Sequence, residues 1–192
     1  MFAVRHVVAA FLLVVAFAAA GQNVSRMSLH VASGLKAGEQ VVTVGDDGWI
    51  RVRYSYKDNG RGPDIEERLR LAPDGTIAEY QSKGTTTFGS VVDERFTRKG
   101  SRAEWKSTSE SGRATVTDSA LYVPINSSFV PMSASIAALA RRPDGKLPLL
   151  PGGTLTQRAV DTITITHEGE SRDLQLLAQT GIGLRPALAW ST

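Results

Sequence analysis

The sequence predicts a mainly β domain, a curved antiparallel meander or open half-barrel with one short helix, about Ser133–Arg142, packed on it. Three observations favour this α+β arrangement. Apolar and polar residues alternate along successive runs, turn-forming residues separate the runs, and a helical pattern occurs at one place. The charged half of each alternation would cover a face in water, and the helix would help to cover the dry face.

Residues 1–20 are typical of a secretory signal peptide. Arg5 charges a short head, Val7–Phe17 is apolar throughout, and Ala18–Ala20 supplies the small residues that signal peptidases accept. The apolar run is shorter than the ~20 residues of a permanent span. We therefore expect cleavage near Ala20, a periplasmic or secreted protein without a permanent membrane span, and one domain over residues 21–192. The alternative is an uncleaved N-terminal anchor.

The first clear strand pattern lies in Trp49–Lys57, where every second residue is apolar or aromatic. The same period resumes in Ile65–Leu71. Between them, Asn59-Gly60 favours a tight hairpin turn, because both residues accept positive φ angles. The residues expected on the buried face are Ile50, Val52, Tyr54, Tyr56, Ile65, Leu69 and Leu71.

More short strands are expected after these two, separated by turn residues such as Pro73-Asp74-Gly75 and Lys99-Gly100. Short strands joined by tight turns are typical of an antiparallel meander. The expected strands are Thr76–Lys83, Thr85–Phe88, Asp93–Arg98 and Ala103–Ser109.

The helix is expected to begin at Ser133 as its cap and to end before Pro143, with Arg141 and Arg142 in its last turn. The residues that would line its apolar side are Met132, Ile136, Leu139 and Ala140.

A final β section is expected after Gly152-Gly153, with Glu168-Gly169-Glu170 as a turn between its last two strands. The apolar run Leu184–Trp190 lies almost at the chain end. This position would fit a terminal strand, or a chain that is cut short within a larger protein. The three expected strands are Thr154–Val160, Asp161–His167 and Arg172–Thr180.

Composition describes an ordinary globular protein, with 42% hydrophobic and 21% charged residues. Cysteine is absent, so packing alone must hold the fold after export. The net charge is +3, of which Arg5 contributes one unit, and the pI is about 9.4. Because basic and acidic residues alternate along the chain, nucleic acid and anionic membranes are not expected partners.

A metal site is not expected. His6 lies in the predicted signal peptide, and His30 and His167 stand alone, with no second histidine at ligand spacing. A catalytic zinc ion needs about three converging protein ligands. We interpret His30 and His167 as surface residues and expect no cofactor in this chain.

A nucleophilic site is also not expected, because cysteine and the Gly-x-Ser-x-Gly elbow are both absent. Ser127-Ser128 is interpreted as loop, and Pro151–Thr154 lacks the lysine of a phosphate-binding loop.

Two carboxylate pairs, Glu66-Glu67 and Asp93-Glu94, are adjacent in the sequence. Neighbours in a strand point to opposite faces, so neither pair can act as an acid–base couple, and solvated or ion-paired surface positions are expected. Glu67 shares the parity of Ile65, which would place it near a sheet edge or beside a basic residue inside. We therefore assign no catalytic residue.

Six motifs, in order, resemble the N-terminal region of exported bacterial proteins of the amidohydrolase family, and the likeness covers nearly the whole chain after residue 20. They are turn and strand motifs. They comprise Tyr56–Pro63, Thr86–Gly89, Val92–Phe96, Trp105–Glu110, Leu121–Asn126 and Leu149–Leu155.

The resemblance implies metal-dependent hydrolysis, often of C–N bonds, in a (β/α)₈ barrel that follows the β region. Its metal ligands begin with a His-x-His motif, which is absent from this sequence. A divalent metal, zinc in the usual case, is therefore expected only in a catalytic domain that this chain lacks, and no functional residue is carried over.

Two hypotheses follow. In the first, the chain is a non-catalytic N-terminal region, present as a truncated product or fragment, that packs against the missing catalytic domain. In the second, it is a periplasmic module that holds an apolar or lipid-like ligand in its curved sheet. The aromatic residues that suggest the second hypothesis, although plain core packing is the favoured interpretation of them, are Tyr54, Tyr56, Phe88, Phe96 and Trp105.

Overall fold

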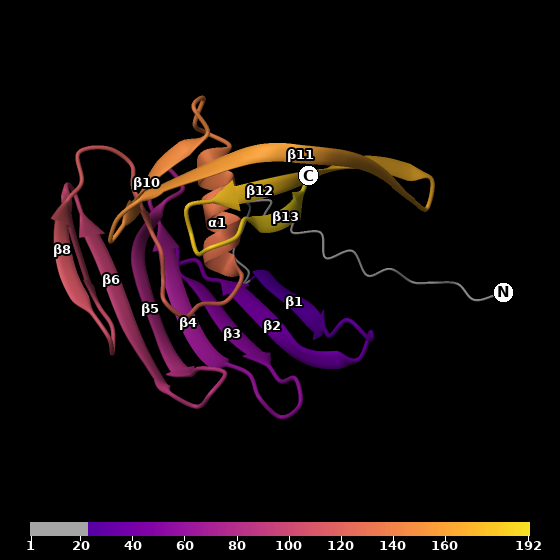
Figure 1. Ribbon diagram of the computed structural model, residues 1–192, viewed down its shortest axis with the longest axis horizontal. Helices are drawn as coiled ribbons and strands as arrows, with labels where there is room; N and C mark the ends of the chain where they lie inside the picture. The colour runs from indigo at the N-terminus through magenta and orange to yellow at the C-terminus, as the bar shows by residue number, and fades with distance from the viewer. Residues whose placement is uncertain (1–22) are drawn as a thin grey trace.

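A computed structural model describes residues 23–192, so the expected signal peptide lies outside the described residues. The first half of the chain folds into an eight-stranded antiparallel meander in which each strand pairs with the next (Figure 1). Its strands are β1 (Asn23–His30), β2 (Lys36–Val44), β3 (Ile50–Tyr56), β4 (Asp64–Leu71), β5 (Ile77–Thr85), β6 (Val91–Lys99), β7 (Arg102–Lys106) and β8 (Ser111–Thr115).

A second sheet of five strands has the order β13-β12-β11-β10-β9. Its pairs are antiparallel except β9 and β10, which are parallel neighbours in the sheet. The helix is the element that connects these two strands along the chain. The long β11–β12 hairpin extends beyond the body of the molecule (Figure 1). The strands are β9 (Leu121–Tyr122), β10 (Lys146–Leu150), β11 (Thr154–His167), β12 (Glu170–Thr180) and β13 (Ala187–Ser191).

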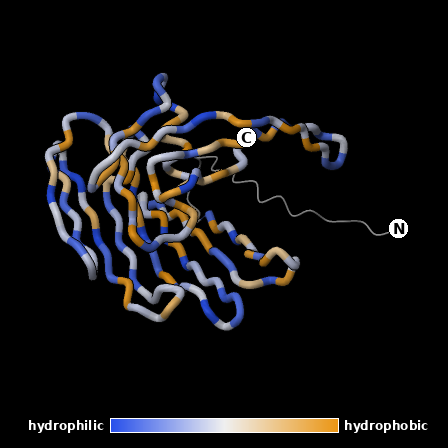
Figure 2. The backbone as a smooth tube through the Cα atoms, in the orientation of Figure 1, coloured by the Kyte–Doolittle hydropathy of each residue, from blue (hydrophilic) through white to orange (hydrophobic). Residues whose placement is uncertain are grey.

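The helix α1 (Val130–Leu139) lies on the concave side of the meander, between the two sheets (Figure 1). Side chains from the meander, the helix and the second sheet form one core cluster there. Along the meander, apolar and polar residues alternate, as the colouring in Figure 2 shows. The core includes Val52, Leu69, Tyr80, Phe96, Tyr122, Leu139, Leu147 and Leu155.

The predicted fold class is confirmed: the protein is mainly β, a curved antiparallel meander with one short helix on it. The alternation also places the correct side chains inward, since Ile50, Val52, Ile65 and Leu69 are buried. The predicted turn is present at Asn59-Gly60, where both residues have positive φ and Asp58 and Arg61 exchange backbone hydrogen bonds.

Several boundaries differ from the prediction. The strand predicted at Thr85–Phe88 is not formed: Thr85 is the last residue of β5, and a turn follows in which the Thr86 carbonyl accepts from the Gly89 N–H at 3.0 Å. The two strands predicted within residues 154–167 are one strand, β11, with a register shift between Ala159 and Asp161.

The helix begins earlier than predicted, at Val130, and its cap position is Phe129 rather than Ser133. Pro131 stands in the first turn, where its missing N–H costs no hydrogen bond. The buried side of the helix also differs from the expected one: Met132 and Ile136 are only partly buried and Ala140 is exposed. The buried helix residues are Val130, Pro131, Ala134, Ser135, Ala138 and Leu139.

Candidate functional site

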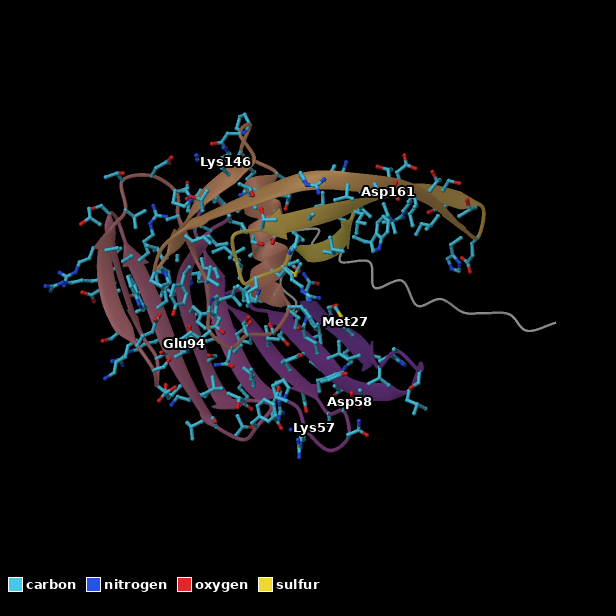
Figure 3. The ribbon with its side chains drawn as sticks, viewed as in Figure 1. Met27, Lys57, Asp58, Glu94, Lys146 and Asp161 are labelled. Atoms are coloured by element: carbon cyan, nitrogen blue, oxygen red, sulfur yellow. The ribbon has the colours of Figure 1, made fainter. Side chains whose placement is uncertain are left out.

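Two carboxylates are buried on the inward face of the meander. Glu67 of β4 is 4% exposed and Glu94 of β6 is 2% exposed, and Ser82 of β5 lies between them in the strand register. Figure 3 marks Glu94 on the meander. The segment that connects β9 to α1, residues 123–129, crosses this face, and we refer to it as the strap.

Glu67 is held by the end of the strap. Its Oε1 atom accepts a hydrogen bond from the Ser128 hydroxyl at 2.7 Å, and its Oε2 atom accepts from the Ser128 N–H at 3.0 Å. The Tyr80 hydroxyl lies 3.0 Å from Oε2. Burial raises the pKa of Glu67 above its usual value, and these hydrogen bonds oppose part of that rise.

The Tyr80 hydroxyl has one proton and two acceptors near it, Glu67 Oε2 at 3.0 Å and the Asn126 carbonyl at 3.1 Å. With Glu67 ionised, this proton must be shared between the two acceptors. With Glu67 protonated, the carboxyl can donate to the Tyr80 oxygen while Tyr80 donates to Asn126. The geometry thus accommodates the neutral carboxyl, in agreement with its raised pKa.

Glu94 holds the start of the strap. Its Oε1 atom accepts from the Tyr122 hydroxyl at 2.6 Å, and the Ile125 N–H lies 3.1 and 3.2 Å from the two oxygens. The Tyr122 ring stacks on Phe96 with 4.2 Å between centroids. Burial raises the pKa of Glu94, and the hydrogen bonds from Tyr122 and the strap lower it in part.

Gln40 of β2 is a third anchor for the strap. It is fully buried, and its Oε1 atom accepts from the Phe129 N–H at 3.0 Å. Three strands of the meander therefore supply acceptors for strap N–H groups, which are buried at Ser128 and part-buried at Ile125 and Phe129. This polar cluster, comprising Gln40, Glu67, Tyr80, Glu94, Tyr122 and Ser128, is called the strap lock below.

The strap lock has the chemistry of a structural contact. The carboxylate oxygens of Glu67 and Glu94 are all engaged by donors of the same chain, and the two residues stand two strands apart, ~9.6 Å in backbone spacing. Among residues 23–192, no group of three or more His, Cys, Asp or Glu side chains could hold a metal ion.

Two predictions about the carboxylates are wrong. Glu94 is buried and not a surface residue, and Glu67 has hydroxyl and amide partners where a basic residue was one of the expected alternatives. Both residues share the parity of apolar neighbours, so their inward position could be inferred from sequence. Ser128, interpreted as loop, is a lock residue 61 positions from Glu67, and the alternation gives no sign of that contact.

The two histidines are not brought together. His30 ends β1, where its Nδ1 atom lies 2.9 Å from the Gly34 carbonyl, and His167 ends β11 in the other sheet. Both are exposed. The His167 Nε2 atom lies 3.8 Å from the Glu168 carboxylate, and both side chains are exposed.

The aromatic residues of the ligand hypothesis divide into three environments. Phe96 is fully buried and Trp105 packs against the same core cluster. Tyr54 is partly buried and meets Phe129 edge-on at 5.6 Å. Phe88 is 83% exposed in the β5–β6 turn.

Comparison of the sequence with protein-family models gives no match, and comparisons with curated proteins and with solved structures also return none. The resemblance to amidohydrolase proteins therefore stays a prediction. Within residues 23–192, no helix has the length and apolar character needed to cross a membrane.

Proposed function

We propose that this chain is a non-catalytic β domain of an exported amidohydrolase-like hydrolase, which supports a separate metal-dependent domain acting on C–N bonds. The observation that carries the proposal is that motifs of the resemblance contact one another in the core. Such motifs would specify a shared scaffold, and they need no catalytic residue among them.

The contacts run through Glu94 and Phe96 of the Val92–Phe96 motif. Glu94 accepts hydrogen bonds from Tyr122 and Ile125 of the Leu121–Asn126 motif, and Phe96 stacks on Tyr122. Phe96 also pairs in register with Trp105. The parallel bridge from Leu121 to Leu149 joins the last motif to the same cluster.

Under this proposal, the strap lock fixes the shape of the domain and the metal belongs to the partner domain. The two histidines of residues 23–192 end strands of different sheets, His30 in β1 and His167 in β11, as a scaffold role allows.

Two measurements test the proposal. The DNA that follows the coding region should encode, in a continuing or frameshifted frame, a His-x-His sequence and a barrel. Purified chain should show no hydrolysis of a panel of amide and peptide substrates with added zinc. Zinc-dependent turnover that survives repurification, or unrelated DNA downstream, would overturn the proposal.

A second candidate function is the periplasmic module for an apolar or lipid-like ligand. The observation that favours it is incomplete cover of the inward face over β1–β3. Met27, labelled in Figure 3, pairs with the inward-facing Gln40 and is only partly buried, and Phe129 is 42% exposed. Native mass spectrometry of protein purified from the periplasm should then show a bound lipid. Apo protein alone would contradict it.

A further inference from the structure

The outward face of the meander carries a transverse row of cations. The strand register aligns Arg51 of β3 with Arg68 of β4, Arg68 with Gln81 of β5, Gln81 with Arg95 of β6, and Arg95 with Lys106 of β7. The four cationic residues are exposed. We refer to these five residues as the basic row.

The basic row is electrostatically unfavourable by itself. Arg51 faces Arg68 and Arg95 faces Lys106 directly across strand pairs, and like charges in that position destabilise a sheet. The neighbouring rows place opposite charges together. Arg70 meets Glu79 at 3.1 Å, for example, and Arg53 meets Glu66 at 3.7 Å.

Few acids neutralise the basic row. Arg51 pairs with Asp47, whereas Arg68 donates to the Gln81 amide oxygen at 2.9 Å and lies over the Trp49 ring. No ion pair formed within residues 23–192 includes Arg68, Arg95 or Lys106. Three of the four cations of the row, all except Arg51, therefore present positive charge that no ion pair compensates.

Two hollows lie along the row. One, of about 650 Å³, is lined by Arg51, Arg68 and Gln81, and also by the acids Asp46, Asp47 and Glu66, of which Asp47 and Glu66 pair with Arg51 and Arg53. The other, of about 550 Å³, is lined by Arg95 and Lys106, and also by Glu104, which pairs with Arg102. The strand spacing of about 4.8 Å makes the row ~19 Å long. An extended chain could occupy both hollows and meet all four cations.

We propose that the basic row binds a linear anionic polysaccharide through its carboxylates, independently of the function proposed above. Three of the four cations are arginines, whose planar forks match carboxylates. A flat bilayer would touch only the crest of this convex face. Proteins that bind single-stranded nucleic acid stack its bases on free aromatic rings. The Trp49 ring beside the row is not free for stacking, because the Arg68 and Arg70 side chains lie over it, 4.8 and 4.7 Å from its centroid.

The test compares two double variants of equal charge. Arg95→Gln with Lys106→Gln removes half of the row's charge, and Arg158→Gln with Arg172→Gln removes the same charge from exposed sites on the β11–β12 hairpin. Calorimetry with oligogalacturonate at low salt measures binding, and uncharged dextran of equal length is the ligand control.

The row variant should lose about ten-fold in affinity, and its plot of log affinity against log salt should flatten by about two units. The hairpin variant should stay within about two-fold of the unchanged protein, and dextran should not bind. Equal losses of affinity in both variants would show that only net charge matters and would overturn the proposal. Absence of oligogalacturonate binding would also overturn it. The same holds if an RNA oligomer or anionic vesicles bind the row more tightly than oligogalacturonate does.

Folding of the variants does not limit the test, because these side chains are exposed and the changes relieve a like-charge contact. Arg68→Lys with Arg95→Lys keeps the charge and removes the forks. This variant should bind oligogalacturonate several-fold more weakly with an unchanged salt slope. Unchanged affinity would contradict carboxylate recognition by arginine.

Discussion

Glu67 and Glu94 are buried without a cationic partner. Each accepts hydrogen bonds from hydroxyl and backbone N–H groups, and the backbone donors are the part-buried N–H of Ile125 and the buried N–H of Ser128. A buried N–H without an acceptor costs free energy comparable to a lost hydrogen bond. The carboxylates therefore supply the hydrogen bonds that the strap N–H groups would otherwise lack. The strap in turn supplies donors that lower the cost of burying the two carboxylates.

Replacing Glu67 with alanine should be strongly destabilising. The change leaves the buried Ser128 N–H and hydroxyl without their acceptor, whereas the Tyr80 hydroxyl keeps the Asn126 carbonyl, and we expect a loss of about 2–4 kcal/mol in the free energy of unfolding. Urea denaturation measures this loss.

The matched control is Glu66→Ala on the same strand. Glu66 faces outward and makes only an exposed ion pair with Arg53 at 3.7 Å, so this change should cost less than about 0.5 kcal/mol. Similar losses for both variants would contradict the role of Glu67 in the strap lock.

The strap lock should also weaken as pH rises. Burial raises the pKa of Glu67 above the value of 4.5 that we take for the unfolded chain. The folded state then holds the proton more tightly, so the contribution of Glu67 to stability is complete below about pH 4.5 and is lost as pH rises through the folded pKa.

Urea denaturation of the unchanged protein and of Glu67→Gln, from pH 4 to pH 8, measures this effect. As pH rises, the unfolding free energy of the unchanged protein should fall relative to that of Glu67→Gln. Groups that titrate in both proteins, such as Asp47 and Asp74, cancel in this difference. A shift in the opposite direction would mean that the folded pKa of Glu67 is lowered.

At the scale of elements, two hairpins use the same two-residue turn with different residues. Asn59 and Glu168 both have φ of 51°, and each is followed by a glycine with positive φ. Asparagine accepts this left-handed conformation more easily than other side chains with a Cβ atom. The β3–β4 turn is therefore well suited to its conformation, and the β11–β12 turn is strained.

Exchanging the residue types should have opposite effects. Asn59→Ala should lower the unfolding free energy by about 1 kcal/mol, and Glu168→Asn should stabilise its hairpin by up to about 1 kcal/mol. Urea denaturation measures the first change. Amide hydrogen exchange measures the second, because a projecting hairpin opens locally. Faster exchange in the Glu168→Asn hairpin would refute the strain argument.

The sequence predicts β3 to β7 well because each has one wet and one dry face. It does not predict β2, where Gly38 and the buried Gln40 interrupt the alternation. The strand β9 has two residues, too few for any periodic pattern. The helix was placed three residues late because Ser133 looks like a cap, whereas Pro131 in the first turn was the better signal.

At the scale of the whole molecule, the sequence predicts that the dry face of the meander is covered, and it predicts one helix that could cover it. A helix of ten residues is smaller than that face, and the second sheet adds Leu147, Leu149 and Leu155 to the cover. The basic row was also missed at this scale. Its four cations are far apart in the sequence and have acidic residues nearby. Only the pairing of the strands aligns Arg51, Arg68, Arg95 and Lys106.

The export prediction concerns residues outside the described part and can be tested directly. Mass spectrometry of protein from the periplasm or medium should give Gly21 as the first residue. Replacing Ala18 and Ala20 with leucine should block cleavage, because the peptidase accepts small residues at those two positions. Ala19→Leu is the control and should be processed. A full-length protein retained at the membrane would support the uncleaved anchor instead.

The strap joins positions that are far apart along the chain: Phe129 bonds to Gln40 across 89 residues, and Ser128 bonds to Glu67 across 61. Hairpins of the meander close short loops, whereas these bonds close very long ones, which costs more chain entropy and slows folding. A nascent chain can therefore build the meander strand by strand during synthesis. It can fasten the strap only after residues 123–129 have been made, when Gln40, Glu67 and Glu94 already stand in finished strands.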